Sequence, residues 1–392
     1  MADDAHPEWR SETRAVRAGR TYNEGSLAPV LWPSTTYFNR SVDEEYALAR
    51  AMHPGKFYSR NGSPSVLEFE DAVAELEGAE AALAFASGMG ALCSVLLTFC
   101  GTGDHVVAQH STFSVTNQMF TMLCPRLGID VTFVDATDSD AVRAAVRPGK
   151  TQLVLVETPC NPGLSVVDLD AVGSIEGPFT VCDSTFAPPP VQQTLSHGID
   201  IVMHAATKGL GGHNDAMLGV IAGERDLIAA VWGHHLIHGA VCSPFDAWNA
   251  LRGIRTLHVR VSQQSESALA LAEFLEGHDT VGRVSYPGLD SHPQREVAKR
   301  QMTMGGSVLT FELAGGLEAG RTFVEAVELA QVAPSLGGPE TLVVHPPTMT
   351  AATLTPDERA AMGIGEGMIR VSVGLEHIDD VIADFGQALA RC

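Results

Sequence analysis

The feature that most constrains the fold of this chain is a set of six short apolar runs, separated from one another by stretches with helical spacing. The runs are ALAFA, HVVAQ, DVTFVD, QLVLVE, FTVCD and DIVMH, between residues 82 and 204. Strands that alternate with helices build a mostly parallel sheet covered by helices on both faces. The pattern therefore predicts an α/β fold, in which ligands bind where the carboxyl ends of the strands meet.

The rest of the chain divides into an N-terminal arm and a second domain. Residues 1–62 show little periodicity and are predicted to form an extended arm, followed by a large domain over residues 63–250. A long helical stretch around Asp246–Gln264 leads into residues 251–392. There the segments SVLTFEL, MIRVSVGL and HIDDVIADFGQALA predict a smaller C-terminal α/β domain.

The charge and the cysteines exclude several classes of protein. The net charge of −22 repels nucleic acid and anionic membranes. The N-terminal MADDAHPEWRSETR has no apolar core of a secretion signal. The seven cysteines are odd in number and form no CxxC pair. These features predict a reduced cytosolic protein.

The uncharged segment Ala81–Cys100 has the length of a membrane span, since about 20 apolar residues suffice to cross a bilayer. The residues SGMG interrupt it in the middle, and its flanks suit a strand followed by a helix. We therefore expect a buried strand–turn–helix unit here and no membrane span.

Three chemically useful features lie at predicted strand ends. Ser87, Gly88 and Met89 stand between a strand and a helix, where free backbone N–H groups can hold a phosphate. Asp183 ends a second strand, and a buried carboxylate is costly unless it has a partner. Lys208 follows a third strand among small residues. Each feature also has an ordinary structural explanation: a common turn, a helix cap and a surface amine.

Together, the three features match what pyridoxal 5'-phosphate requires of a protein. The lysine amine bonds to the cofactor aldehyde, the carboxylate keeps the pyridine nitrogen protonated, and the helix start holds the phosphate. Lys208 would then be a covalent anchor and proton carrier, and Asp183 the partner of the ring nitrogen.

Longer motifs extend this interpretation to nearly the whole chain. They are YSRNGSPSVLEFEDAVAELEG, AFASGMGA, ETPCNPGLSVVD, VCDSTFAPP, ATKGLGGHND and SLGGPETLVVHPPTMT. From about Pro29 to Leu389 the sequence resembles the pyridoxal-phosphate enzymes of cysteine and methionine metabolism, which include cystathionine γ-lyase, cystathionine γ-synthase and methionine γ-lyase. The resemblance implies the aspartate-aminotransferase-like fold type I, with a large sheet domain and a smaller C-terminal α/β domain.

The resemblance also implies roles for individual residues. Those that would contact the cofactor are Tyr58, Arg60, Ser87, Gly88, Met89, Phe113, Asn161, Asp183, Thr207 and Lys208. Tyr58 and Arg60 would reach the phosphate of a neighbouring subunit, because the family is typically tetrameric, built from two dimers whose subunits share active sites. Asn161 and Ser335 would position the substrate, and Arg370 would clamp its α-carboxylate in the bidentate geometry of a guanidinium.

Five positions depart from the family pattern. Phe113 stands where a tyrosine usually stacks on the cofactor, so the hydroxyl credited with acid–base work at the leaving group is absent. Val115 replaces a cysteine common in methionine γ-lyases, and Pro334 stands where cystathionine-cleaving members often carry glutamate. Ala205 replaces a phosphate-binding serine, and Gly209 replaces the usual tyrosine after the lysine. The pattern predicts an intact scaffold with an altered substrate pocket.

Three functions are consistent with these residues. The favoured hypothesis is a lyase acting by γ-elimination on a sulfur amino acid such as cystathionine or methionine, with Lys208 and Phe113 at the reacting centre. A γ-replacement enzyme, which joins a nucleophile to an activated homoserine ester, is the alternative. A homologue that binds the cofactor but has lost catalysis through Phe113 is the third hypothesis. His110 and Tyr58 are the nearest substitutes, by motif position, for the missing hydroxyl.

One histidine pair is a candidate for metal binding. His234 and His238 have the four-residue spacing of ligands on one helix face. The glutamate of a zinc-protease motif and a nearby third ligand are both missing, so no metal site is predicted.

Overall fold

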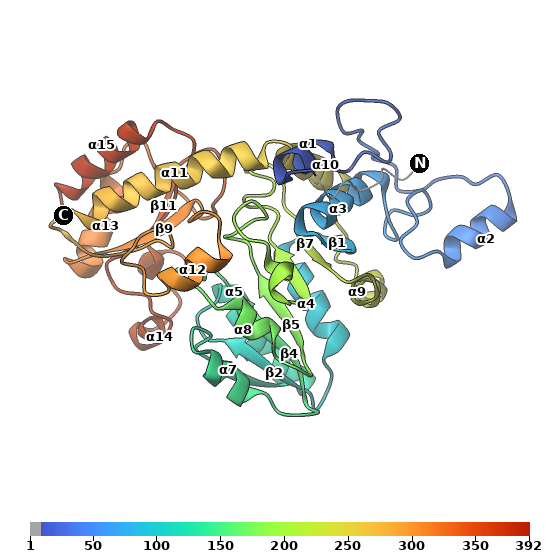
Figure 1. Ribbon diagram of the computed structural model, residues 1–392, viewed down its shortest axis with the longest axis horizontal. Helices are drawn as coiled ribbons and strands as arrows, with labels where there is room; N and C mark the ends of the chain where they lie inside the picture. The colour runs from blue at the N-terminus through green and yellow to red at the C-terminus, as the bar shows by residue number, and fades with distance from the viewer. Residues whose placement is uncertain (1–8) are drawn as a thin grey trace.

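The computed structural model describes residues 9–392, and Figure 1 shows two sheet-containing bodies that the long helix α11 (Leu257–Glu276) links along one side. The larger body is built on a seven-stranded sheet of order β1-β7-β6-β5-β4-β2-β3. Its strands are β1 (Ala81–Phe85), β2 (His105–Gln109), β3 (Asp130–Val134), β4 (Thr151–Glu157), β5 (Phe179–Asp183), β6 (Ile201–His204) and β7 (Gly219–Gly223). Strands β3, β2, β4, β5 and β6 are parallel, whereas β7 is antiparallel to β1 and β6. The predicted α/β fold class is confirmed.

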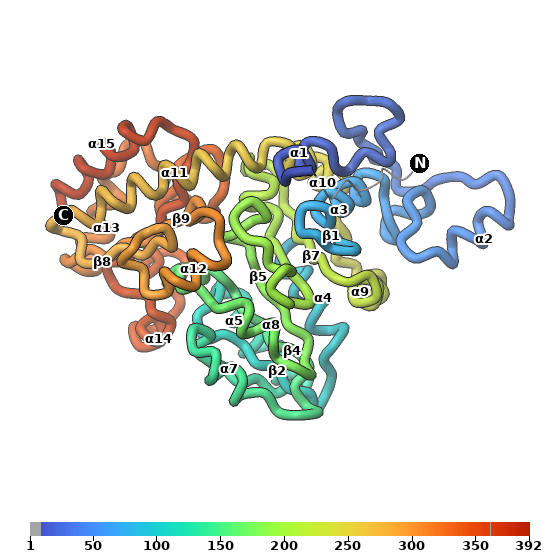
Figure 2. Tube along the Cα trace, viewed as in Figure 1, coloured from blue at the N-terminus to red at the C-terminus, as the bar shows by residue number. Residues whose placement is uncertain are grey.

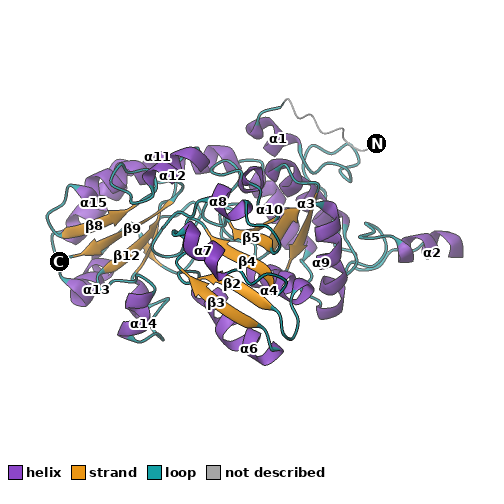
Figure 3. Cartoon of the chain, turned by 60° about the horizontal axis from the view of Figure 1, so that its bottom comes forward, coloured by secondary structure: helices purple, strands orange, loops and turns teal. Residues whose placement is uncertain are grey.

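Helices cover both faces of this sheet, as Figure 3 shows. Side chains of β1 alternate between two cores, with Ala82 and Ala84 on the side of α3 and α10, and Leu83 and Phe85 on the side of α4 and α9. The helices of this body are α3 (Pro64–Glu77), α4 (Gly88–Phe99), α5 (Ser114–Gln118), η1 (Met119–Leu123), α6 (Cys124–Leu127), α7 (Ser139–Ala145), α8 (Leu169–Gly173), η2 (Thr194–His197), α9 (Arg225–His238) and α10 (Pro244–Ile254).

The smaller body is a five-stranded sheet of order β10-β11-β12-β9-β8 with helices against it. Its strands are β8 (Val281–Ser285), β9 (Val308–Leu313), β10 (Gln331–Val332), β11 (Leu342–Val344) and β12 (Met368–Ser372). Besides α11, its helices are α12 (Arg295–Gln301), α13 (Gly316–Ala326), η3 (Pro346–Thr348), α14 (Pro356–Ala361) and α15 (Ile378–Leu389). Phe311, Phe323 and Phe385 pack ring against ring at its centre, with centroids 5.2 to 6.4 Å apart.

The segment Ala81–Cys100 forms the expected strand–turn–helix unit. The turn is short because Ser87 caps α4, its Oγ accepting a hydrogen bond from the backbone N–H of Gly90 at 3.0 Å. Within residues 9–392, no helix has both the length and the apolar character needed to cross a membrane.

The N-terminal arm differs from the extended segment that the sequence predicts. It contains the helices α1 (Ser11–Arg17) and α2 (Val42–Arg50), and α2 projects away from the rest of the chain in Figures 1 and 2. Helix α2 buries none of its residues, and Ser41 caps its start. Residues 1–8, which open the segment inspected for a secretion signal, lie outside the described residues.

The helical stretch around Asp246–Gln264 is likewise two helices rather than one. Helix α10 ends at Ile254 and α11 begins at Leu257. Arg260 of α11 is buried and donates to the backbone oxygens of Gly209 and Gly253, so the break brings a guanidinium under the segment that follows Lys208.

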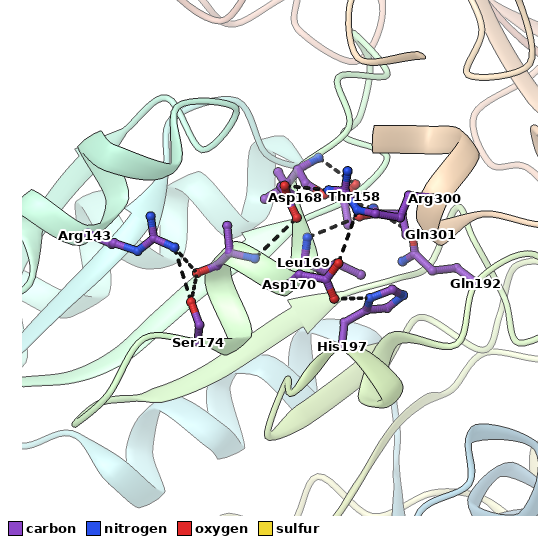
Figure 4. Close-up of polar contacts among 12 residues, drawn as sticks. Arg143, Thr158, Asp168, Leu169, Asp170, Ser174, Gln192, His197, Arg300 and Gln301 are labelled. Carbon is purple, nitrogen blue, oxygen red and sulfur yellow. Dashed lines mark hydrogen bonds and ion pairs between the residues drawn. The ribbon is translucent and has the colours of Figure 1, made fainter. Parts of the chain in front are cut away.

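Helix α12 joins the smaller body to the larger one through polar contacts, shown in Figure 4. Arg300 reaches Asp168 at 2.6 Å and Asp170 at 3.3 Å. The buried amide of Gln301 donates to the backbone oxygen of Val167 and accepts from the N–H of Leu169. These contacts fix the position of the smaller body beside the strand ends of the large sheet.

Candidate active site

Three neighbouring strands of the large sheet end at the candidate site. Strands β4, β5 and β6 are adjacent and parallel, and Glu157 and Asp183 occupy the same register on β4 and β5. Strand β6 leads through His204 into the segment that carries Lys208. The topology therefore places the predicted carboxylate and lysine at one edge of the sheet.

Asp183 is buried, with hydrogen bonds to only one of its carboxyl oxygens. Its Oδ1 accepts from the backbone N–H of Thr185 at 3.0 Å and from the hydroxyl of Thr185 at 2.5 Å. No described residue donates to Oδ2. Burial raises the pKa of Asp183, and the bonds from Thr185 act in the opposite direction. A buried carboxylate oxygen without a partner fits a cationic ring N–H, which would favour its ionised form.

The amine of Lys208 lies in a setting that favours its neutral form. Its Nζ donates a hydrogen bond to Ser335 Oγ at 2.8 Å. Burial, together with the nearby guanidinium of Arg370, lowers the pKa of Lys208 to about 8. Because the neutral amine is the nucleophilic form, this shift prepares Lys208 to bond to an aldehyde near neutral pH.

Arg370 on β12 is a buried cation whose described partners are all neutral. It is 5% exposed, and its Nη1 donates to Asn161 Oδ1 at 2.9 Å while Nη2 donates to the backbone oxygen of Ser335 at 3.0 Å. Burial lowers the pKa of Arg370 to about 10. A buried guanidinium without a counter-ion is unfavourable, so this arrangement fits a ligand that brings its own carboxylate.

Ser335 connects the lysine to the arginine. Its hydroxyl accepts from Lys208 and its carbonyl accepts from Arg370, at a φ of 102° that few residues with a side chain adopt. Such strain costs on the order of 1–3 kcal/mol and is concentrated at functional sites. Two residues on, a Cβ at Gly337 would lie 2.6 Å from the backbone N of Gly209, so the two loops are in close contact.

Glu157 is a site residue that the sequence reasoning missed. Its carboxyl is buried, and it accepts hydrogen bonds from the backbone N–H groups of Phe113 at 2.8 Å and Asn161 at 2.6 Å. Burial and the neighbouring Asp183 raise the pKa of Glu157 to about 8. The signal was available, because QLVLVE ends in a carboxylate just as FTVCD does.

Asn161 and Arg370, two of the three predicted substrate residues, line one small hollow of about 30 Å³, whereas Ser335 does not. Phe113, Asn161 and Arg370 all contribute to it, together with apolar side chains from the chain between Ala351 and Ile364. Phe113 is 38% exposed, which leaves its ring accessible for stacking. Neither His110 nor Tyr58 of the described chain lines this hollow.

The predicted phosphate site is the N-terminus of α4. The N–H groups of Gly88 and Met89 have no partner among the described residues, and Ser87 Oγ is used as the helix cap. A Cβ on Gly88 would lie 2.9 Å from the Cβ of Ala205, so glycine permits this close approach. The hydroxyl of Thr207 donates to the backbone oxygen of Leu218 at 3.2 Å. These free amides fit a phosphate.

Tyr58 and Arg60 are not brought to this cluster. The guanidinium of Arg60 lies 5.3 Å from the centre of the Tyr58 ring and donates to the backbone oxygen of Leu236 in α9 at 3.3 Å. Both residues belong to the exposed arm, and no described interaction joins them to Lys208, Asp183 or Arg370.

The histidines of α9 are not arranged around a metal in the described residues. His238 Nε2 lies 3.0 Å from the hydroxyl of Ser94. Over residues 9–392, no group of three or more His, Cys, Asp and Glu side chains has the geometry of a metal site.

The fold, the lysine at a strand end and the free amides of α4 are those of a pyridoxal-phosphate enzyme of fold type I. Residues 12–390 match the family described as Cys/Met metabolism PLP-dependent enzyme, and the chain belongs to this family. The predicted cofactor and family are therefore confirmed.

Relatives of known function extend over the same length. The chain is 40% identical to an O-succinylhomoserine sulfhydrylase of Pseudomonas aeruginosa, over 97% of this chain and 95% of the relative. It is also 40% identical to an L-methionine gamma-lyase of Porphyromonas gingivalis, over 96% of each chain. The crystal structure of metB from Corynebacterium glutamicum superposes with a TM-score of 0.90 at 34% identity, covering 98% of each chain.

Proposed function

We propose that this enzyme expels the substituent on the γ-carbon of an α-amino acid, acting as a carbon–sulfur lyase by γ-elimination on substrates such as cystathionine or methionine. The main support for the proposal is the setting of Arg370. Its buried guanidinium has only neutral partners among the described residues, so it can bind the substrate carboxylate. When bound, pyridoxal 5'-phosphate supplies an electron sink that makes the protons on the α- and β-carbons acidic.

The residues around Arg370 have separate tasks in this reaction. Asn161 and Ser335 orient the guanidinium, which fixes the substrate at its carboxylate end. Because Lys208 Nζ bonds to the same Ser335, the amine lies beside the bound carboxylate, where it can accept the α-proton. The ring of Phe113 excludes water from the hollow and offers a stacking surface.

A second candidate function is γ-replacement on an acylated homoserine, and Phe113 favours it. A departing thiolate gains from a proton donor, whereas a departing carboxylate needs little protonation. The hollow of Phe113 contains no acid–base side chain besides Arg370 in the described chain, so a carboxylate leaving group suits it better. The sulfhydrylase of Pseudomonas aeruginosa is named for such a substrate, O-succinylhomoserine.

Product analysis tests both functions on the purified holoenzyme. Each of L-methionine, L-cystathionine and O-succinyl-L-homoserine is incubated with and without ethanethiol, and 2-oxo acid, ammonia and the new S-ethyl thioether are quantified. Elimination yields 2-oxo acid and ammonia, whereas replacement yields a thioether only when thiol is present. Turnover of none of these substrates, despite bound cofactor, would contradict both and leave the cofactor-binding homologue.

The exposed side chains of the N-terminal arm support the proposal that two subunits share an active site in a dimer or tetramer. Phe38, Val42 and Tyr46 are 92%, 84% and 61% exposed, an unusual density of solvent-facing apolar side chains on one projecting segment. Tyr58 and Arg60 stand at the base of this arm, free of their own chain's lysine site. Contact with a second copy would cover the arm and carry both residues toward that copy's phosphate site.

A further inference from the structure

A second, larger cavity lies between the two bodies. Its volume is about 640 Å³, within the usual range for small-molecule sites. One wall comes from β8 and β9 of the smaller sheet, and the other from the strand ends and loops of the large sheet. It is separate from the hollow of Phe113 and Arg370, although Met362 lines both.

The wall from the smaller sheet presents two opposite charges that do not pair. Arg283 and Glu312 are cross-strand partners on β8 and β9, yet no ion pair joins them. Glu312 Oε1 accepts from the backbone N–H of Gly367 at 2.8 Å, and the guanidinium of Arg283 has no hydrogen bond to any described residue. Cross-strand neighbours of opposite charge usually pair. Because no ion pair joins these two, both groups remain available to a ligand.

The facing wall adds a carboxylate and an imidazole. Asp135 uses one carboxyl oxygen to accept from Thr137 at 2.9 and 2.7 Å, and its other oxygen has no described partner. His110 is exposed at the same wall, with its ring against Phe133 and no side-chain hydrogen bond in the described chain. The cavity therefore has a carboxylate on each side, with the guanidinium of Arg283 on one side and the imidazole of His110 on the other.

We propose that this interdomain cavity binds a second small zwitterion, a free α-amino acid, in addition to the amino acid that reacts at Lys208. Arg283 receives its carboxylate, and Glu312 with Asp135 receives its ammonium. A simple anion would leave Glu312 and Asp135 unpaired, and a simple cation would leave Arg283 unpaired, so the mixture selects for a zwitterion over either.

The cavity shares its wall with the substrate hollow. Ser111 and Cys160 line the cavity, whereas Phe113 and Asn161, one or two residues along the same segments, line the hollow. Ser111 Oγ also donates to the backbone oxygen of Met362 at 3.3 Å. An amino acid in the cavity would thus contact the segments that Glu157 holds in place beside the substrate.

The test must separate this site from the active site, which also binds amino acids. Reduction of the holoenzyme with borohydride locks the cofactor onto its lysine and blocks covalent capture of an amino acid. Isothermal titration of the reduced holoenzyme then uses three probes with one side chain: L-methionine, 4-(methylthio)butanoate and 3-(methylthio)propylamine. L-Methionine should bind with one site per chain, and each single-charge analogue at least about ten-fold more weakly.

Variants locate the binding. Arg283→Gln and Glu312→Gln, tested separately, should each weaken L-methionine binding by about ten-fold or more, whereas Arg252→Gln, at an exposed arginine of α10, should not. No heat from L-methionine would overturn the proposal. So would equal binding of the butanoate analogue, which would indicate a plain anion site, or unchanged binding in both cavity variants.

Discussion

Glu157 and Asp183 end adjacent parallel strands at the same register, and both carboxyls are buried. Two such groups cannot both lose their protons without a large electrostatic cost, and Glu157 keeps its proton up to a pH of about 8. The neutral acid accepts hydrogen bonds from the backbone N–H groups of Phe113 and Asn161, both of which line the substrate hollow. Glu157 therefore positions both Phe113 and Asn161.

The raised pKa of Glu157 predicts how stability depends on pH in the cofactor-free protein. The folded state binds a proton at Glu157 that the unfolded state loses above its ordinary pKa of 4.5, so the free energy of unfolding should fall as pH rises from about 4.5 to about 8. Glu157→Gln cannot ionise and should flatten this decline. Urea unfolding at pH 5, 6.5 and 8 measures it, with Glu325→Gln at an exposed helix position as the control. Equal slopes for wild type and Glu157→Gln would contradict the assignment.

Lys208→Ala should lower turnover by at least about a thousand-fold, because the variant loses both the covalent anchor and the proton carrier. The cofactor should still bind noncovalently through Asp183 and α4, without the absorbance of the lysine-bound form. Steady-state rates and absorbance spectra measure the two effects. Partial rescue by added ethylamine, absent in the wild type, would support the role, and near-normal turnover without added amine would refute it.

Mixed subunits test whether Tyr58 and Arg60 serve a neighbouring chain. Arg60→Ala and Lys208→Ala are each expected to be inactive alone, but a mixture after subunit exchange should regain up to about a quarter of wild-type activity. Half of randomly paired dimers are hybrids, and each hybrid has one intact site of two. In the control mixture, Asp183→Ala with Lys208→Ala, each lesion stays in its own chain's site, so both sites of every hybrid are defective and no activity should be regained. Absence of recovery despite proven exchange would mean that each chain completes its own site.

The fold and the cofactor could be predicted because their signals are local. Apolar runs of five or six residues with helical stretches between them identify the parallel strands, and residues at strand ends such as Asp183 and Lys208 then meet at one edge. Helix α2 is not predicted in this way, and none of its residues is buried in its own chain.

No local sequence pattern predicts the contacts between the two bodies. A series of hydrogen bonds joins Lys208, Ser335, Arg370 and Asn161, and its partners are as far as 209 positions apart in the sequence. This series depends on how the smaller sheet is placed on the larger one. The φ of 102° at Ser335 is likewise a product of tertiary packing, and so are the two hydrogen bonds by which Glu157 holds Phe113 and Asn161.

Phe113→Tyr should raise the rate on thioether substrates without a matching change in cofactor affinity. The wild-type ring lines the substrate hollow, and in the described chain no other proton donor there besides Arg370 is ionisable. General acid–base help is worth about a hundred- to ten-thousand-fold, so a hydroxyl that reaches the leaving thiolate should give a clear gain on methionine and cystathionine. Steady-state rates of both proteins, beside a cofactor titration, measure it. Phe113→Leu, which loses the ring, should instead weaken cofactor binding.

The choice of leaving group decides how this result is interpreted. A carboxylate departs without an acid, so Phe113→Tyr should leave the rate on O-succinyl-L-homoserine nearly unchanged while the rate on thioethers rises. Gains of equal size on both substrates would mean that the hydroxyl acts before the leaving group departs. If every thioether reacts at the wild-type rate or more slowly, the missing hydroxyl is not the limitation. In that case the hollow is shaped around phenylalanine, and the carbon–sulfur lyase hypothesis gives way to γ-replacement on an acylated homoserine.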